Sequence, residues 1–194
     1  MIMQSLNHMC YVMSGQMQVG QGEQVLTALL GSCVGIGMIW RAQRRCGLAH
    51  CFLPDGVEPG EQSARYVSAA VPKLLAALGV RREQYDEVDV VIAGGARMLN
   101  LRSADGTVGS RNIEAAREQL SARGLQVMFQ DVGGSQGRRL SIDCDRQTFS
   151  VVRIARDAAR DVARDVAREV VRDAAHGNAH GFAHGFAREQ AVAA

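Results

Sequence analysis

The sequence lacks long apolar runs and a strong excess of one charge, and both absences exclude classes of protein. No stretch approaches the ~20 apolar residues that a membrane-spanning helix needs, and no basic segment followed by a continuous apolar one opens the chain. We therefore expect a cytoplasmic protein without membrane insertion. The formal net charge is only +2 and aromatic residues make up 5% of the chain, so the composition does not indicate nucleic-acid binding.

Closely paired cysteines are also absent. The five cysteines are irregularly spaced and odd in number, unlike the disulfide framework of a small secreted domain, so reduced thiols are expected. None has the two-residue spacing of a structural zinc site or a thiol redox motif. We therefore predict no metal and no cofactor. Apart from Cys33, the cysteines are interpreted as small apolar core residues: Cys10, Cys46, Cys51 and Cys144.

The most informative stretch covers residues 25–54. A strand over 25–30 delivers Thr27, and alternation after Cys33 indicates a second strand over 33–40, with an apolar face and a nearly bare face. A polar loop then leads to an apolar run over 46–53, which predicts an antiparallel hairpin. A two-residue turn at Ala42-Gln43 sets His50 opposite Gly35 and makes Cys33 its diagonal neighbour, roughly 7–8 Å away at Cβ. A turn one residue longer or shorter would separate the two side chains onto opposite faces.

The rest of the chain predicts further strands and two helices. Strands are expected over 11–19, 88–93, 125–130, 139–144 and 148–154, and helices over 62–78 and from an N-cap at Ser110 to Gly124. Gly94-Gly95 indicates a close backbone approach, and 133–138 a turn. Strands come in runs without regular βαβ alternation. This pattern favours an α+β fold, a mixed-sheet α/β sandwich with flanking helices, over residues 1–154.

Residues 155–194 form a separate low-complexity tail with a four-residue repeat. Arg and Asp or Glu recur at i,i+3, which favours a charged, solvated helix, and a disordered tail is the alternative. His176, His180 and His184 raise the possibility of a metal site. They occupy the repeat phase of the arginines, however, and glycines weaken any helix that would present them, so repeat drift is favoured over metal binding.

Five motifs together resemble the CheD family of chemoreceptor glutamine deamidases. They are LLGSCVG, GLAHCFLP, AGGARM, VGSRN and DVGGSQGR, in that order. The resemblance implies a cytoplasmic α/β sandwich whose catalytic core is related to the cytotoxic necrotizing factor toxins. It also implies a protein-glutamine amidohydrolase that acts on the cytoplasmic helices of chemoreceptors, with a CheC-type phosphatase as a partner known in some relatives.

By motif, the family's catalytic set falls on Cys33, His50 and Thr27. A glutamine amide is a poor electrophile, so a thiolate that forms a thioester suits the reaction. His50 would take the thiol proton, return it to ammonia and then activate water, while Thr27 orients the imidazole. The oxyanion and substrate are expected to bind at Gly31, Ser32 and Gly35.

Two other functions compete with this interpretation. A non-catalytic adaptor could bind receptors or the phosphatase, but it would not need the complete Thr27, Cys33 and His50 set. A thiol redox protein would need a resolving cysteine in a Cys-x-x-Cys motif, with two residues between the cysteines, which the sequence lacks.

Overall fold

The computed structural model describes residues 8–57, 60, 63–97 and 107–154. The predicted repeat tail over 155–194 and its three histidines lie outside the described residues. The domain boundary at 154 therefore stays a prediction.

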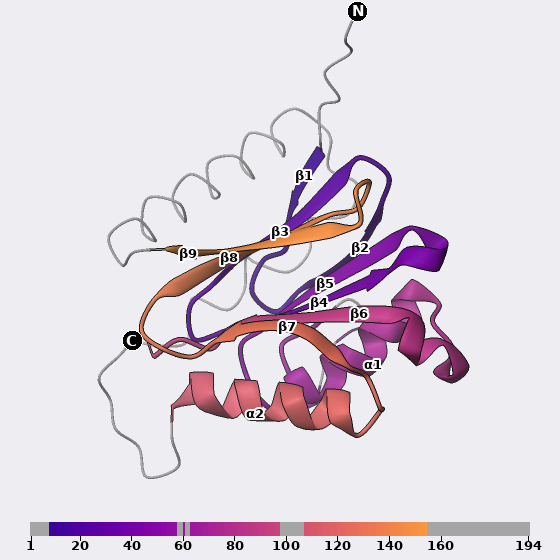
Figure 1. Ribbon diagram of the computed structural model, residues 1–194. Helices are drawn as coiled ribbons and strands as arrows, with labels where there is room; N and C mark the ends of the chain where they lie inside the picture. Colours follow the sequence, from indigo (N-terminus) through magenta and orange to yellow (C-terminus); the bar gives the residue numbers. More distant parts are fainter. Residues whose placement is uncertain (1–7, 58–59, 61–62, 98–106, 155–194) are drawn as a thin grey trace, which may run out of the picture. The chain divides into compact units, whose positions relative to one another are not determined.

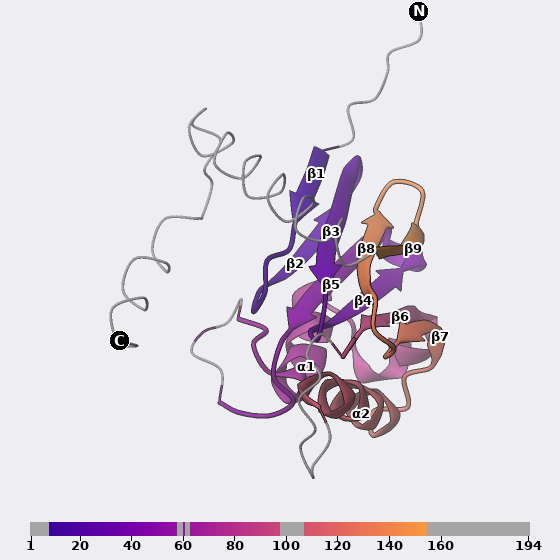
Figure 2. The ribbon, with the colours of Figure 1, turned by 90° about the vertical axis from the view of Figure 1, so that its left-hand side faces the viewer.

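Within the described residues, nine strands form two mixed sheets (Figures 1 and 2). The four-stranded sheet has the order β1 (His8–Tyr11), β3 (Gln24–Leu30), β8 (Gly137–Asp143), β9 (Thr148–Ile154). The five-stranded sheet has the order β2 (Met17–Gln21), β5 (Arg45–Cys51), β4 (Val34–Trp40), β6 (Val88–Gly94), β7 (Val127–Val132). In each sheet one pair is parallel, β1 with β3 and β6 with β7, and the other pairs are antiparallel. The predicted α+β class is confirmed.

Two α-helices, α1 (Val67–Leu78) and α2 (Val108–Ser121), cover the face of the five-stranded sheet that is turned away from the other sheet (Figure 1). The core is therefore double. One apolar cluster lies between helices and sheet, and the second lies between the two sheets. Among the described residues, no helix is long and apolar enough to cross a membrane.

Strand β4 separates the two clusters and is buried along its whole length. Its apolar face, with Ile36 and Met38, packs against the helices as the alternation predicts. Gly35 and Gly37 leave the other face nearly bare of side chains, as predicted, and the four-stranded sheet packs directly onto it. A Cβ on Gly37 would lie 2.7 Å from Ile142 Cδ1, so glycine is needed there for the sheets to pack this closely.

The predicted register of the β4–β5 hairpin is confirmed, since Gly35 pairs with His50 and Trp40 with Arg45. The connection is a short 3₁₀ turn, η1 (Arg41–Gln43), closed by Arg44 in the left-handed region at φ 50°. Another 3₁₀ turn, η2 (Arg82–Glu87), precedes β6.

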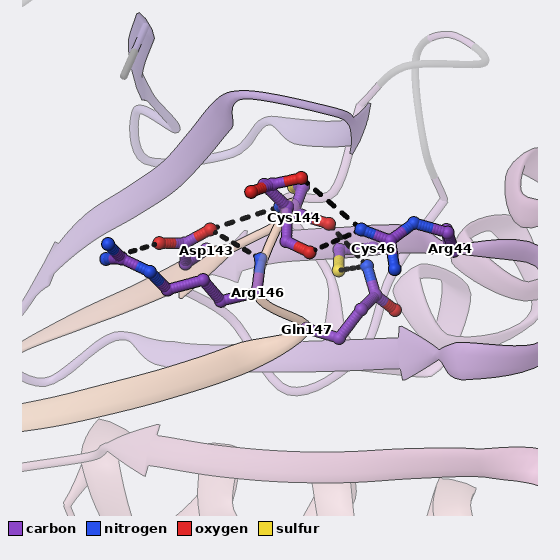
Figure 3. Close-up of polar contacts among 7 residues, drawn as sticks. Arg44, Cys46, Asp143, Cys144, Arg146 and Gln147 are labelled. Atoms are coloured by element: carbon purple, nitrogen blue, oxygen red, sulfur yellow. Dashed lines mark hydrogen bonds and ion pairs between the residues drawn. The ribbon is translucent and has the colours of Figure 1, made fainter. Parts of the chain in front are cut away.

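The β8–β9 turn packs against the hairpin turn (Figure 3). Arg44 Nη2 donates to the carbonyl oxygen of Asp145 at 2.7 Å, and Gln147 Nε2 donates to Cys46 Sγ at 3.4 Å. Within the β8–β9 turn, the Asp143 carboxylate accepts the backbone N–H of Asp145 and of Arg146. These contacts join the two sheets at this end of the molecule.

Three predicted elements were wrong in detail. The strand predicted over 11–19 is instead the last residue of β1, a crossing segment over 12–16 with Gly15 at φ 81°, and the start of β2, which lies in the other sheet. Helix α1 begins at Val67, since 63–66 are not helical. The N-cap of α2 is Thr107, whose hydroxyl accepts the Ser110 N–H, so Ser110 lies inside the first turn.

Candidate active site

Cys33 ends a turn, residues 31–33, that connects β3 to β4. The three carbonyl oxygens of this turn accept hydrogen bonds from Ala96 N (to Gly31, 2.7 Å), Asn112 Nδ2 (to Ser32, 3.1 Å) and Gly95 N (to Cys33, 2.7 Å). A trans peptide directs each N–H away from the preceding carbonyl. The N–H groups of Ser32 and Cys33 therefore point away from these donors.

Gly94 makes this arrangement possible. Its φ is 102°, and a Cβ at this position would lie 2.3 Å from the Cys33 carbonyl oxygen. The close backbone approach predicted at Gly94-Gly95 is thus confirmed, and the segment approached is the cysteine turn itself.

Asn112 supports the turn from α2. The side chain is fully buried, and its Nδ2 donates to the carbonyl oxygens of both Ser32 and Phe52 at 3.1 Å. Phe52 directly follows β5, which carries His50. A single amide therefore links the segment that carries the cysteine to the segment that carries the histidine. Sequence reasoning gave Asn112 no role beyond its place in the VGSRN motif.

The Cys33 thiol is partly exposed and packs against the cluster between the sheets. Its Sγ lies 3.8 Å from the Ser14 hydroxyl oxygen. Burial raises the pKa of the Cys33 thiol, and hydrogen bonds from Ser14 and from the residue's own backbone N–H act in the opposite direction. Near neutral pH the group is mainly a thiol that needs a base.

His50 is 5% exposed, and because its neighbours Ala49 and Cys51 face the helices, its side chain points to the side of the cluster between the sheets, against which Cys33 also packs. Its Nδ1 is 2.9 Å from the Val12 carbonyl oxygen, which can only accept, so Nδ1 carries the proton. Nε2 is left as the basic nitrogen, and it has no hydrogen-bond partner among the described residues. Burial lowers the pKa of His50, which keeps the ring neutral.

Residues 12–16 hold both groups, and the sequence analysis missed them. Val12 binds the imidazole and Ser14 the thiol, while Gly15 N donates to the His50 carbonyl and Gln16 O accepts the His50 N–H. A strand interpretation of 11–19 hid this role. The only local signal was the Ser-Gly pair at 14–15, which is typical of a turn.

The structure does not bring the Thr27 hydroxyl to the imidazole. Leu26 and Ala28 face the cluster between the sheets, so the Thr27 side chain points to the opposite face of β3. There its Oγ1 is 2.8 Å from Ser141 Oγ and donates to the Leu140 carbonyl at 3.2 Å. Its contact with the site is through the backbone, because the Thr27 carbonyl accepts the Val12 N–H at 2.8 Å.

Gly35 also has a different environment from the expected one. It is buried inside β4 between His50 and Ala93, and a Cβ at this position would meet Leu30 Cδ1 at 2.7 Å. Gly35 therefore serves the packing of the two sheets, and its backbone is not available to a substrate.

No group of three or more acidic, cysteine or histidine side chains that could hold a metal ion occurs within the described residues. The histidines of the repeat tail are not among them.

Comparison with known proteins identifies the family. The family model described as CheD chemotactic sensory transduction matches residues 52–153. A probable chemoreceptor glutamine deamidase CheD 2 of Ruegeria sp. (strain TM1040) is 36% identical over 165 residues, covering 75% of this chain and 92% of that protein. This chain belongs to the CheD family. A probable chemoreceptor glutamine deamidase CheD of Bdellovibrio bacteriovorus is 32% identical over 151 residues, covering 76% of this chain and 96% of the relative.

The match to the CheD family model begins just after His50, so it does not include Thr27, Cys33 or His50. Among solved structures, the Bacillus licheniformis hypothetical protein YfiH aligns with a TM-score of 0.37 and 15% identity, over 59% of this chain and 49% of that one. A similarity this low assigns no fold.

Proposed function

We propose that this CheD protein is a protein-glutamine amidohydrolase that converts glutamine side chains of chemoreceptor cytoplasmic helices to glutamate. The names of its relatives support the substrate. One observation carries the chemistry: a partly exposed thiol, Cys33, lies on the same side of the five-stranded sheet as His50, whose basic Nε2 has no partner among the described residues. The proposed setting is the cytoplasm, where these receptor helices lie.

The reaction begins with a neutral thiol and a neutral imidazole. His50 Nε2 takes the Cys33 proton as sulfur attacks the amide carbon, and then returns it to the departing ammonia, which leaves a thioester. The same nitrogen activates a water molecule that hydrolyses the thioester to the carboxylate. The hydrogen bond from His50 Nδ1–H to the Val12 carbonyl holds the tautomer that these proton transfers need. Thr27 contributes through its carbonyl, which accepts the Val12 N–H and so positions that residue.

The oxyanion is assigned to the N–H groups of Ser32 and Cys33. Three hydrogen bonds fix the carbonyls of the turn, including that of Gly31, on the opposite side, so these donors are already oriented before substrate binds. The proposed core arrangement is that of the cytotoxic necrotizing factor toxins, and a CheC-type phosphatase is a second proposed partner.

The test uses a purified glutamine-bearing receptor fragment incubated with the full-length protein. Peptide mass mapping should locate a glutamine-to-glutamate conversion, with one ammonia released for each conversion. His50→Gln serves as the control, because its amide can still donate to Val12 but cannot act as a base. Receptor binding without any conversion would favour the adaptor interpretation instead.

A further inference from the structure

Ser14 is a third polar side chain at the Cys33 thiol. Its Oγ lies 3.8 Å from Cys33 Sγ, within the range of a hydrogen bond to sulfur, although the two residues are far apart in the chain. Ser14 belongs to neither sheet, since it lies in the segment that crosses from β1 to β2.

The position of Ser14 is fixed on both sides. Val12 donates its N–H to Thr27 and accepts from His50 Nδ1. Gly15 donates its N–H to the His50 carbonyl and accepts the Ala64 N–H, both at 2.8 Å. The backbone that carries the hydroxyl is therefore attached to the strand that carries the proposed base.

The chemistry of the pair changes when the thiol loses its proton. While Cys33 is a thiol, either atom can be the donor of the hydrogen bond. A thiolate can only accept, so the hydroxyl then becomes the donor, and a hydrogen bond to a charged acceptor is stronger than one between neutral groups. A hydroxyl at this position therefore favours the ionised sulfur.

We infer that Ser14 is a catalytic residue, which donates a hydrogen bond to the Cys33 thiolate and increases its population. This inference rests on the proposed function, in which Cys33 is the nucleophile. Ser14 and Val12, which both lie in the segment over 12–16, then prepare the nucleophile together with His50. Ser14 acts on the thiol directly, and Val12 acts through His50.

The test measures the thiol and does not depend on a receptor. Cys33 alkylation by iodoacetamide is followed across pH by peptide mass mapping in wild type and in Ser14→Ala. A tenfold loss of thiolate, partly offset by the higher nucleophilicity of a more basic sulfur, should slow alkylation about threefold near neutral pH. The midpoint of the profile should move to higher pH.

Three controls isolate the hydroxyl. Ser14→Thr keeps it and should restore alkylation toward the wild-type rate. Cys10, the other partly exposed cysteine, has Gln24 rather than serine beside its sulfur and should react equally in every variant. Ser121→Ala makes the same substitution at an exposed position and should leave the Cys33 profile unchanged.

An unchanged Cys33 profile in Ser14→Ala would overturn the inference. So would an equal loss in Ser14→Thr and Ser14→Ala, since the effect would then be one of packing. If wild type fails to deamidate the receptor fragment, the proposed function is wrong. The alkylation profiles still decide whether Ser14 stabilises the thiolate.

Discussion

The β4–β5 hairpin has cysteines at both ends, in opposite surroundings. At the open end, Cys33 is partly exposed, lies beside the Ser14 hydroxyl and is on the same side of the sheet as His50. At the turn end, Cys46 and Cys144 are fully buried, and the Gln147 amide donates to Cys46 Sγ and to the Cys144 carbonyl (Figure 3).

Burial alone does not separate the proposed nucleophile, Cys33, from a structural thiol. The hydrogen bond to Cys46 and burial raise the pKa of Cys144, so it stays protonated. Burial raises the pKa of Cys33 as well. What distinguishes Cys33 is partial access, a hydroxyl donor and a neutral base on the same face, because a thiol reacts as its thiolate and only where a reagent can reach it.

Replacing Cys33 and Cys46 by alanine, one at a time, should give the largest effects. Cys33→Ala should lower deamidation at least about a thousandfold, since the nucleophile is lost, with little change in stability. Cys46→Ala should keep the activity but lower the free energy of unfolding by about 1–2 kcal/mol, because loss of the sulfur atom leaves a void between the sheets. Ammonia release and denaturant unfolding measure the two quantities.

The comparison fails if Cys46→Ala, still folded by circular dichroism, loses activity as fully as Cys33→Ala. The two ends of the hairpin would then act as one unit.

The buried amides at the two ends allow a second, smaller contrast. Asn112→Ala removes the donor that links Ser32 to Phe52, and a misplaced nucleophile turn should lower deamidation about 10- to 100-fold. Gln147→Ala removes the equivalent donor at the turn end. It should lower stability by about 1–3 kcal/mol and leave the rate per folded molecule unchanged.

The rates are compared after correction for the folded fraction of each variant. Equal losses of activity in the two variants would mean that both amides only stabilise the fold.

The hairpin could be predicted from sequence because its signals are local. Alternation after Cys33 and the polar loop predict a hairpin. Which residues face each other depended on the assumed two-residue turn at Ala42-Gln43, since a one-residue slip would turn His50 to the other face. The Gly94-Gly95 pair likewise predicted a close approach of the backbone. Sequence could not name the Cys33 carbonyl as the group approached, since that contact joins distant parts of the chain.

The missed features all depend on how the two sheets pack. Residues 11–19 were predicted to form one strand, but Tyr11 ends β1, which pairs in parallel with β3 in the four-stranded sheet, while 17–19 begin β2 in the other sheet. Thr27 belongs to the catalytic set by motif, but its buried side chain lies on the face of β3 away from the other sheet, because periodicity defines two faces without saying which one meets the other sheet. Ser14 and Val12 reach the site only because residues 12–16 cross from one sheet to the other.

The smallest expected effect is on the pH dependence of the free energy of unfolding, to which His50 at the open end of the hairpin contributes. Burial lowers the pKa of His50 in the folded state, so below about pH 6.5 the unfolded chain binds more protons at this residue than the folded one. Its contribution to stability is therefore present above that pH and is lost as the pH falls toward the folded pKa. His50→Gln cannot take up this proton and should lose less stability on acidification than wild type.

The measurement is the free energy of unfolding from about pH 7.5 down to about pH 5, compared between wild type and each variant, so that all other titrating groups cancel. His8→Gln, an exposed histidine on β1, is the matched control and should follow wild type. If His50→Gln runs parallel to wild type, burial does not lower the pKa of this imidazole. If His50→Gln instead loses more stability than wild type on acidification, the folded state holds the proton on His50, and the proposed starting state of a neutral thiol beside a neutral base must be replaced by an ion pair.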